Sequence, residues 1–340
     1  LMGCAQSPAA ADWVRQTVGI DLCTVPASQV RVAFRATNGY GNNIFLDNIS
    51  VAPGSPTVAQ PANQVLCNGT ATTAVTFTGT VPGTTFSWTN NTPSVGLAAS
   101  GTGNIASFNA VNTGTAPVVA TITVTPALGT CTGTPVNFTI TVNPTPNAVA
   151  TPAAQTICTG TAITTIALTS AVTGTTYAWT RNNTATVTGI AASGSGNISG
   201  SLTNTTTAPV TVTFTITPTA NSCPGAPITA TVIVNPLPTI TCPGNITAPS
   251  SIGSCTAIVN YTATATGVPA PTFTYSFSGA TTGSGNGTGS GSAFTVGTTN
   301  VTVTATNACG SASCSFTVTV TDSQLPVVTT QPANRTACAG

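Results

Sequence analysis

Hydrophobic and polar side chains alternate along most of the chain. In the runs 74–78, 118–124 and 136–142, Val, Ile, Phe or Ala occupy alternate positions and Thr or Asn fills most of the others. A period of two predicts β-strands that turn one face to a core. Gly, Pro and Asn interrupt the runs about every 8 to 12 residues. This pattern predicts an all-β chain of two-layer antiparallel sandwiches.

The chain contains an internal repeat with a period of about 92 residues, which is typical of one domain per repeat rather than of a solenoid. We therefore expect one sandwich at 54–145 and a second at 146–237. The matching segments are 67–70 with 158–161, 83–88 with 174–179, 96–105 with 189–198, and 115–118 with 207–210.

Each repeat carries two cysteines separated by about 65 residues. The first cysteine falls in an early strand and the second just before the last strand. We expect the disulfides Cys67–Cys131 and Cys158–Cys223, one inside each sandwich. A loop of this length would stabilise each fold by about 4 kcal/mol in the chain-entropy model.

Each repeat also carries one tryptophan, Trp88 or Trp179, in a strand that reads Phe-Ser-Trp or Tyr-Ala-Trp. An exposed tryptophan would offer a stacking platform for a glycan. A tryptophan packed between two sheets is the more frequent arrangement in sandwiches. We expect both residues in the cores.

The amino-acid composition argues against most classes of enzyme. The 340 residues include five Arg and four Asp but no Lys, Glu or His, so the usual general bases and metal ligands are missing. We expect no enzyme, no catalytic residue and no cofactor. A net charge of +1 argues against nucleic acid and anionic lipid as partners, and no apolar run is long enough for membrane insertion.

Eleven cysteines without any His or Cys-x-x-Cys pair favour disulfides over metal or redox sites. The predicted compartment is therefore oxidising, which means extracellular or at the cell surface.

The two repeats resemble the PKD-like domains of very long secreted proteins of the Bacteroidetes group. The resemblance covers roughly 56–236 and depends on the cysteines, on the Gly-Thr-Thr-Tyr-x-Trp segment and on the closing Val-Asn-Pro. The acidic Trp-Asp-Phe-Gly-Asp-Gly motif of true PKD domains is absent, so the resemblance implies architecture alone.

A third unit, 238–323, resembles the hyalin repeat (HYR), an Ig-like adhesion module, in the segments 241–247, 294–307 and 314–322. Its four cysteines allow three connectivities. Analogy with the neighbouring repeats favours Cys242–Cys314 and leaves Cys255–Cys309. HYR domains often read Thr-Asp where this chain has Thr-Asn, which argues against a cation there.

The two ends add partial units. Residues 1–53 resemble the C-terminal part of a MAM-like or cleaved-adhesin jelly roll, and that resemblance makes Asp47 a weak candidate for Ca²⁺. Residues 324–340 restart the PKD-like repeat, so we expect the partner of Cys338 beyond the end. The roles of Cys4 and Cys23 stay open.

Short Pro-rich joints predict a stiff rod of tandem Ig-like sandwiches stapled by disulfides. We expect a non-catalytic structural or adhesive protein that forms an extracellular stalk or filament, with self-association and a surface or glycan ligand as partners. Two alternatives stay open: a polymerising fibre subunit joined by strand complementation, and the accessory tail of a secreted hydrolase.

Overall fold

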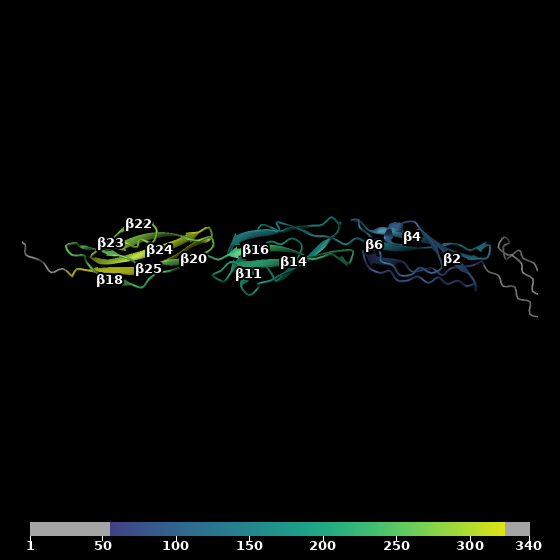
Figure 1. Ribbon diagram of the computed structural model, residues 1–340, viewed down its shortest axis with the longest axis horizontal. Coiled ribbons are helices and arrows are strands. Elements are labelled where there is room, and N and C mark those ends of the chain that lie inside the picture. Colours follow the sequence, from purple (N-terminus) through teal and green to yellow (C-terminus); the bar gives the residue numbers. More distant parts are fainter. Residues whose placement is uncertain (1–54, 324–340) are drawn as a thin grey trace, which may run out of the picture. The chain divides into compact units, whose positions relative to one another are not determined.

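The structure is a computed structural model that describes residues 55–323. These residues form three all-β sandwiches, which we number 1 to 3 in chain order (Figure 1). Sandwiches 2 and 3 belong to one compact unit, and sandwich 1 belongs to another. The segments 1–53 and 324–340, and with them Asp47, Cys4, Cys23 and Cys338, lie outside the described residues.

Sandwich 1 has a main sheet in the order β1-β6-β4-β2-β3, with β5 paired to β4. The first strand, β1, runs parallel to the last strand, β6, and every other pair in this sheet is antiparallel. The facing layer is held by two isolated bridges, Ala71 to Asn109 and Val75 to Ile105. The elements are β1 (Gln64–Cys67), β2 (Thr85–Asn90), the 3₁₀ helix η3 (Pro93–Val95), β3 (Ser100–Thr102), β4 (Val118–Leu128), β5 (Cys131–Thr132) and β6 (Val136–Asn143).

Sandwich 2 repeats this plan with the sheet β12-β10-β14-β16-β8, in which β8 runs parallel to β16 and β15 pairs with β14. Its facing layer contains the pairs β7-β9 and β11-β13. The strands are β7 (Val149–Thr151), β8 (Ala154–Cys158), β9 (Ala167–Thr169), β10 (Thr176–Arg181), β11 (Val187–Gly189), β12 (Ser193–Ser195), β13 (Leu202–Asn204), β14 (Val210–Ala220), β15 (Cys223–Pro224) and β16 (Ile228–Asn235).

Sandwich 3 has the sheet β18-β25-β24-β21-β22, again with a parallel pair, β18 and β25, at one side (Figure 1). The facing layer is made by β19-β23 and β17-β20. The strands are β17 (Thr239–Thr241), β18 (Ile246–Pro249), β19 (Thr256–Val259), β20 (Thr264–Thr266), β21 (Thr272–Gly279), β22 (Gly283–Asn286), β23 (Ser292–Thr295), β24 (Gly297–Asn307) and β25 (Gly310–Thr321).

Each sandwich has its own hydrophobic core between its two layers. On the long strands the alternation read from the sequence matches burial: Val212, Phe214 and Ile216 of β14 are fully buried while the intervening Thr side chains are less buried or exposed. Each aliphatic side chain that is buried in this way stabilises the fold by about 1.5–3 kcal/mol.

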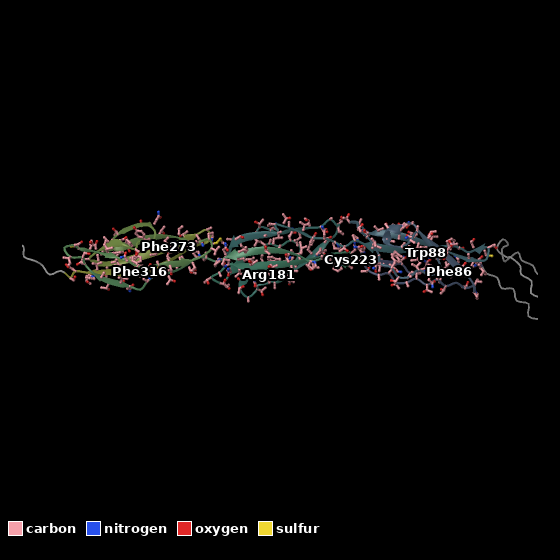
Figure 2. The ribbon with its side chains drawn as sticks, viewed as in Figure 1. Phe86, Trp88, Arg181, Cys223, Phe273 and Phe316 are labelled. Carbon is pink, nitrogen blue, oxygen red and sulfur yellow. A yellow bond between two sulfur atoms is a disulfide. The ribbon has the colours of Figure 1, made fainter. Side chains whose placement is uncertain are left out.

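Both tryptophans lie in the cores, as expected, with 8% of Trp88 and 8% of Trp179 exposed. Trp88 lies beside Phe86 in sandwich 1 (Figure 2), and Trp179 meets Phe214 edge to face at 5.7 Å. A glycine lies on the neighbouring edge strand against each indole ring, where a methyl group would overlap the ring. The tryptophans therefore serve packing rather than glycan stacking.

Charge is almost absent from the described part of the chain, where Arg181 and Asp322 are the only charged side chains. The Arg181 guanidinium donates hydrogen bonds to the carbonyl oxygens of Ile190 (2.7 Å) and Val187 (3.0 Å). Burial lowers the pKa of this guanidinium. None of the described helical segments is long and apolar enough to cross a membrane.

The stability of sandwich 3 should not change with pH near neutrality and should fall at alkaline pH. Burial, with a smaller contribution from Tyr275, raises the pKa of Tyr261 from 10.0 to about 12, and its hydroxyl donates to the Thr288 carbonyl at 2.7 Å. The stabilisation is complete below pH 10 and is lost as the pH rises through 12. Thermal unfolding between pH 6 and 12 should show this fall, and Tyr261→Phe should reduce its slope. An equal slope in the variant would contradict the assignment.

Candidate functional site

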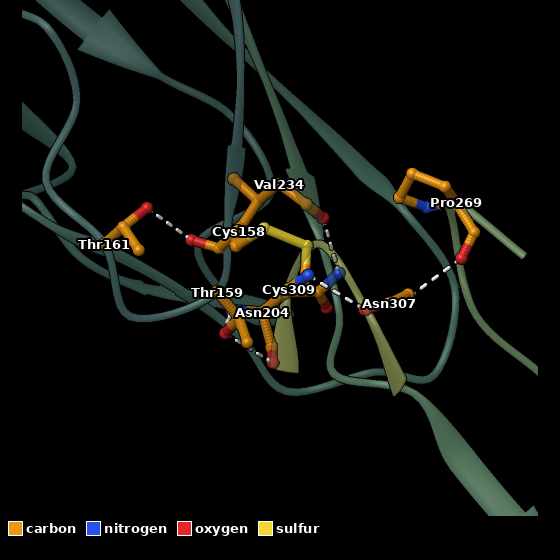
Figure 3. Close-up of a disulfide and its surroundings, with 8 residues drawn as sticks. All are labelled: Cys158, Thr159, Thr161, Asn204, Val234, Pro269, Asn307 and Cys309. Atoms are coloured by element: carbon orange, nitrogen blue, oxygen red, sulfur yellow. Dashed lines mark hydrogen bonds between the residues drawn. A yellow bond between two sulfur atoms is a disulfide. The ribbon is translucent and has the colours of Figure 1, made fainter. Parts of the chain in front are cut away.

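The described residues contain no cluster of three or more His, Cys, Asp or Glu side chains that could hold a metal ion. What distinguishes this chain is a disulfide that joins sandwich 2 to sandwich 3. It links Cys158 to Cys309, which are 151 residues apart in sequence and 5.1 Å apart between their Cα atoms (Figure 3). We call this bond and the residues that hold it the clamp.

On the sandwich 2 side, Cys158 is the last residue of β8 and pairs with Asn235 at the end of β16. The parallel pairing therefore places it where the chain leaves the sandwich. A tight turn follows, in which the carbonyl oxygen of Cys158 accepts hydrogen bonds from the backbone N–H of Thr161 (3.1 Å) and from its hydroxyl (2.7 Å). Gly160 supplies the positive φ of 80° that this turn requires.

A buried asparagine, Asn204, fixes the same end of the sandwich (Figure 3). Its side-chain amide donates to the carbonyl oxygens of Val234 (2.8 Å) and Ala208 (2.7 Å). Its backbone N–H donates to the hydroxyl of Thr159, which directly follows Cys158, at 2.8 Å. A buried amide that satisfies its hydrogen bonds in this way holds its neighbours in one arrangement, so β8, β13 and β16 end together.

On the sandwich 3 side, Cys309 lies in the two-residue turn between β24 and β25. Asn307 holds this turn from both sides (Figure 3). Its side-chain oxygen accepts a hydrogen bond from the Cys309 backbone N–H at 2.8 Å, and its side-chain nitrogen donates to the Pro269 carbonyl at 2.8 Å. The side-chain amide of Asn307 thus supplies a donor that an ionised Asp would lack.

The expected pairing Cys158–Cys223 is wrong, because the sheet places these cysteines at opposite ends of sandwich 2. Cys158 pairs with Asn235 beside the first residue of β14, whereas Cys223 pairs with Ala220, the last residue of the same strand. A strand of 11 residues is roughly 30 Å long. A disulfide requires Cα atoms less than about 7 Å apart.

The same register excludes the expected pairing Cys67–Cys131 in sandwich 1. Cys67 pairs with Asn143 at the end of β6, and Cys131 pairs with Leu128 at the far end of the 11-residue strand β4. Both cysteines are disulfide-bonded. Since sandwich 1 contains no other cysteine, each of them has its partner outside this sandwich.

In sandwich 3 one expected pairing is present and the other is not. Cys242 is bonded to Cys314 in β25, with 5.9 Å between their Cα atoms. The pairing Cys255–Cys309 is wrong, since Cys309 is taken by Cys158 and Cys255 is an exposed free thiol. Analogy with the neighbouring repeats led to the error because it assumed that each disulfide stays inside one sandwich.

Sequence reasoning missed the clamp because the direction in which a strand pairs cannot be read from its residues. In sandwich 2 the strand β8 runs parallel to the last strand, β16, so both strands end where the chain leaves the sandwich. Cys158 closes β8 and therefore lies at the end opposite the hairpin that carries Cys223.

Comparisons with known proteins agree with this architecture. The PKD-like domain family matches residues 64–146 and 155–238, and the HYR domain family matches 234–320. The chain contains two PKD-like domains followed by an HYR domain. The clamp therefore joins the second PKD-like domain to the HYR domain.

No curated protein matches the chain. Among solved structures, an I-band fragment from titin is similar at 12% identity and a TM-score of 0.46, over 79% of this chain and 99% of the fragment. Mouse cadherin-23 EC22-24 is similar at 13% identity and a TM-score of 0.42, over 79% of this chain and 99% of that one.

Replacing Asn307 by Asp should weaken the HYR side of the clamp at neutral pH. The carboxylate would keep the bond from the Cys309 N–H but would face the Pro269 carbonyl without a donor, at a cost of about 0.5–1.5 kcal/mol because this hydrogen bond is exposed. Protonation near pH 3 would restore a donor, so the deficit should shrink there.

The measurement is thermal unfolding of the oxidised full chain at pH 7 and pH 3. Asn300→Asp on the exposed face of the same strand, β24, is the matched control and should change stability little. Equal destabilisation by the two substitutions would contradict the role assigned to Asn307.

Proposed function

We propose that this chain is a non-catalytic segment of an extracellular stalk, in which PKD-like and HYR domains act as spacers that carry tensile load. The observation that carries the proposal is the clamp. Because Cys158 lies where the chain leaves sandwich 2, the bond to Cys309 gives load a covalent route into β25 that bypasses the linker at 236–238.

The covalent route also protects the folded parts. Residues between Cys158 and Cys309 form a closed loop, so tension applied outside the loop cannot extend them while the bond is intact. The chain-entropy model assigns a loop of this size about 5 kcal/mol of stabilisation. Both effects suit a spacer that must keep its length.

The nearly uncharged surface supports the same role. With Arg181 and Asp322 as the only charges in residues 55–323, no long-range electrostatic field is available to steer a charged ligand. Paired hydroxyl groups instead line the outer face of β24 and β25, as in Thr302 with Ser315 (2.9 Å) and Thr304 with Ser313 (2.8 Å). Such a surface favours short-range contacts that depend weakly on salt. Self-association into a filament stays a prediction.

Cutting the linker tests whether the clamp carries load. A recognition site for a specific protease is inserted between Leu237 and Pro238, and the oxidised full chain is cleaved. We expect the two halves to remain joined on a non-reducing gel. A single molecule held by its termini in a force spectrometer should likewise stay tethered until a reductant is added.

The matched control carries the same insertion together with Cys158→Ser, and it should separate on cleavage without reductant. Separation of the oxidised chain that retains both cysteines would overturn the proposed load path.

A further inference from the structure

A shallow hollow of about 310 Å³ lies on the outer face of the main sheet of sandwich 1, over β2, β3 and β4. Two rows of hydroxyl groups cross these strands, and the cross-strand pair Trp88 and Gly101 lies between the rows. Because successive side chains of a strand point to opposite faces, the Trp88 side chain turns to the core and the rows turn outward. The first row is Thr102, Ser87 and Thr125, and the second is Ser100, Thr89 and Thr123.

The hydroxyl groups of these six residues are not used to hold the protein together. Within residues 55–323, none of them forms a hydrogen bond with another group. The outer face of sandwich 3 differs, because hydroxyl groups there bond to one another across β24 and β25, as Thr298 does to Thr319 at 3.3 Å. A hydroxyl group can both donate and accept a hydrogen bond. The hollow therefore presents six such groups on paired strands, all of them available to a ligand.

An exposed amide extends the second row onto the next strand. Thr123 pairs with Asn137 of β6, whose side chain is exposed and has no partner among the described residues. The amide of Asn137 adds two donors and one acceptor. The second row thus crosses four strands that are spaced about 4.8 Å apart, so it spans about 14 Å. This length exceeds that of a single sugar ring.

We propose that the hollow binds a neutral oligosaccharide, which lies across β3, β2, β4 and β6. Sugar hydroxyl groups donate and accept as the lining groups do, so each bond can form in either sense. The lining has no charged side chain, and an anionic ligand would lose hydration without gaining a counter-charge. It also has no exposed apolar side chain for a lipid or an apolar peptide. The twist of a β-sheet favours a flexible chain over a flat crystalline surface.

Sandwich 2 carries the same grid with two differences. Its strands β12, β10, β14 and β16 pair in the register of β3, β2, β4 and β6. Ala178 lies where sandwich 1 has Ser87, and Thr229 lies where it has Asn137. Sandwich 2 therefore lacks one hydroxyl group and the amide. Since each neutral hydrogen bond contributes modestly, we expect sandwich 2 to bind the same sugar roughly tenfold more weakly.

Titration of the oxidised full chain with neutral hexasaccharides tests the proposal. The probes are maltohexaose, cellohexaose and mannohexaose, and the readout is the backbone amide NMR signals of the isotope-labelled chain. We expect at least one probe to shift the signals of Ser87, Thr89 and Thr123 saturably. Hexagalacturonate, which is charged, should not shift them. No saturable shift with any neutral probe, or equal binding of the charged one, would overturn the proposal.

Exchanging the two differing residues between the sandwiches locates the site. Ser87→Ala with Asn137→Thr should lower the affinity of sandwich 1 roughly tenfold, and Ala178→Ser with Thr229→Asn should raise that of sandwich 2 by a similar factor. All four side chains are exposed, so the folds should persist, and thermal unfolding checks this. An unchanged affinity of sandwich 1 in the first variant would overturn the proposal.

Two controls separate this binding from other roles of the chain. Dilution of the chain without sugar should leave the signals of the hollow in place, whereas a shift on dilution would show that a second copy covers this face and would overturn the proposal. The variant Cys158→Ser, which lacks the clamp, should bind sugar as the unsubstituted chain does. Failure of the load-bearing role and failure of sugar binding are therefore distinguishable.

Discussion

The positions of the cysteines depend on one constraint, the parallel pairing of an early strand of each sandwich with its last strand. In sandwich 2 the ladder between β8 and β16 brings Cys158 to Asn235, so an early residue of the domain lies at its downstream end. A purely antiparallel sheet would have placed that cysteine near the start of the last strand. The direction of one edge strand thus decides whether a disulfide closes a domain on itself or reaches the next one.

Local hydrogen bonds hold Cys158 and Cys309 in place. A disulfide needs this, because it tolerates little variation in the separation of the two Cα atoms. Asn204 and the turn after Cys158 fix one sulfur, and Asn307 fixes the other. Each of these contacts joins an uncharged side chain to a backbone carbonyl or N–H group. A chain nearly devoid of charge can therefore still build a defined joint, because neutral hydrogen bonds and a covalent bond replace ion pairs.

The sequence predicts much of the fold because the relevant signals are local and repeated. Alternation of Val, Ile and Phe with Thr identifies the long strands, and the PKD-like repeat shows that Trp88 and Trp179 share one environment. The pairing of the cysteines depends on which residues the sheet brings together, and this information is not local. A separation of about 65 residues says nothing of which end of a sheet each cysteine occupies, and only the register of β14 and β16 reveals that Cys158 and Cys223 lie apart.

Covalent continuity between sandwiches 2 and 3 depends on the bond Cys158–Cys309. The most direct measurement is tandem mass spectrometry of a non-reduced digest of the native chain, aimed at the peptide that contains Cys158. We expect this peptide to be bonded to the one that contains Cys309. A peptide in which Cys158 is bonded to Cys223 would mean that sandwich 2 is closed on itself, and it would contradict a covalent joint to sandwich 3.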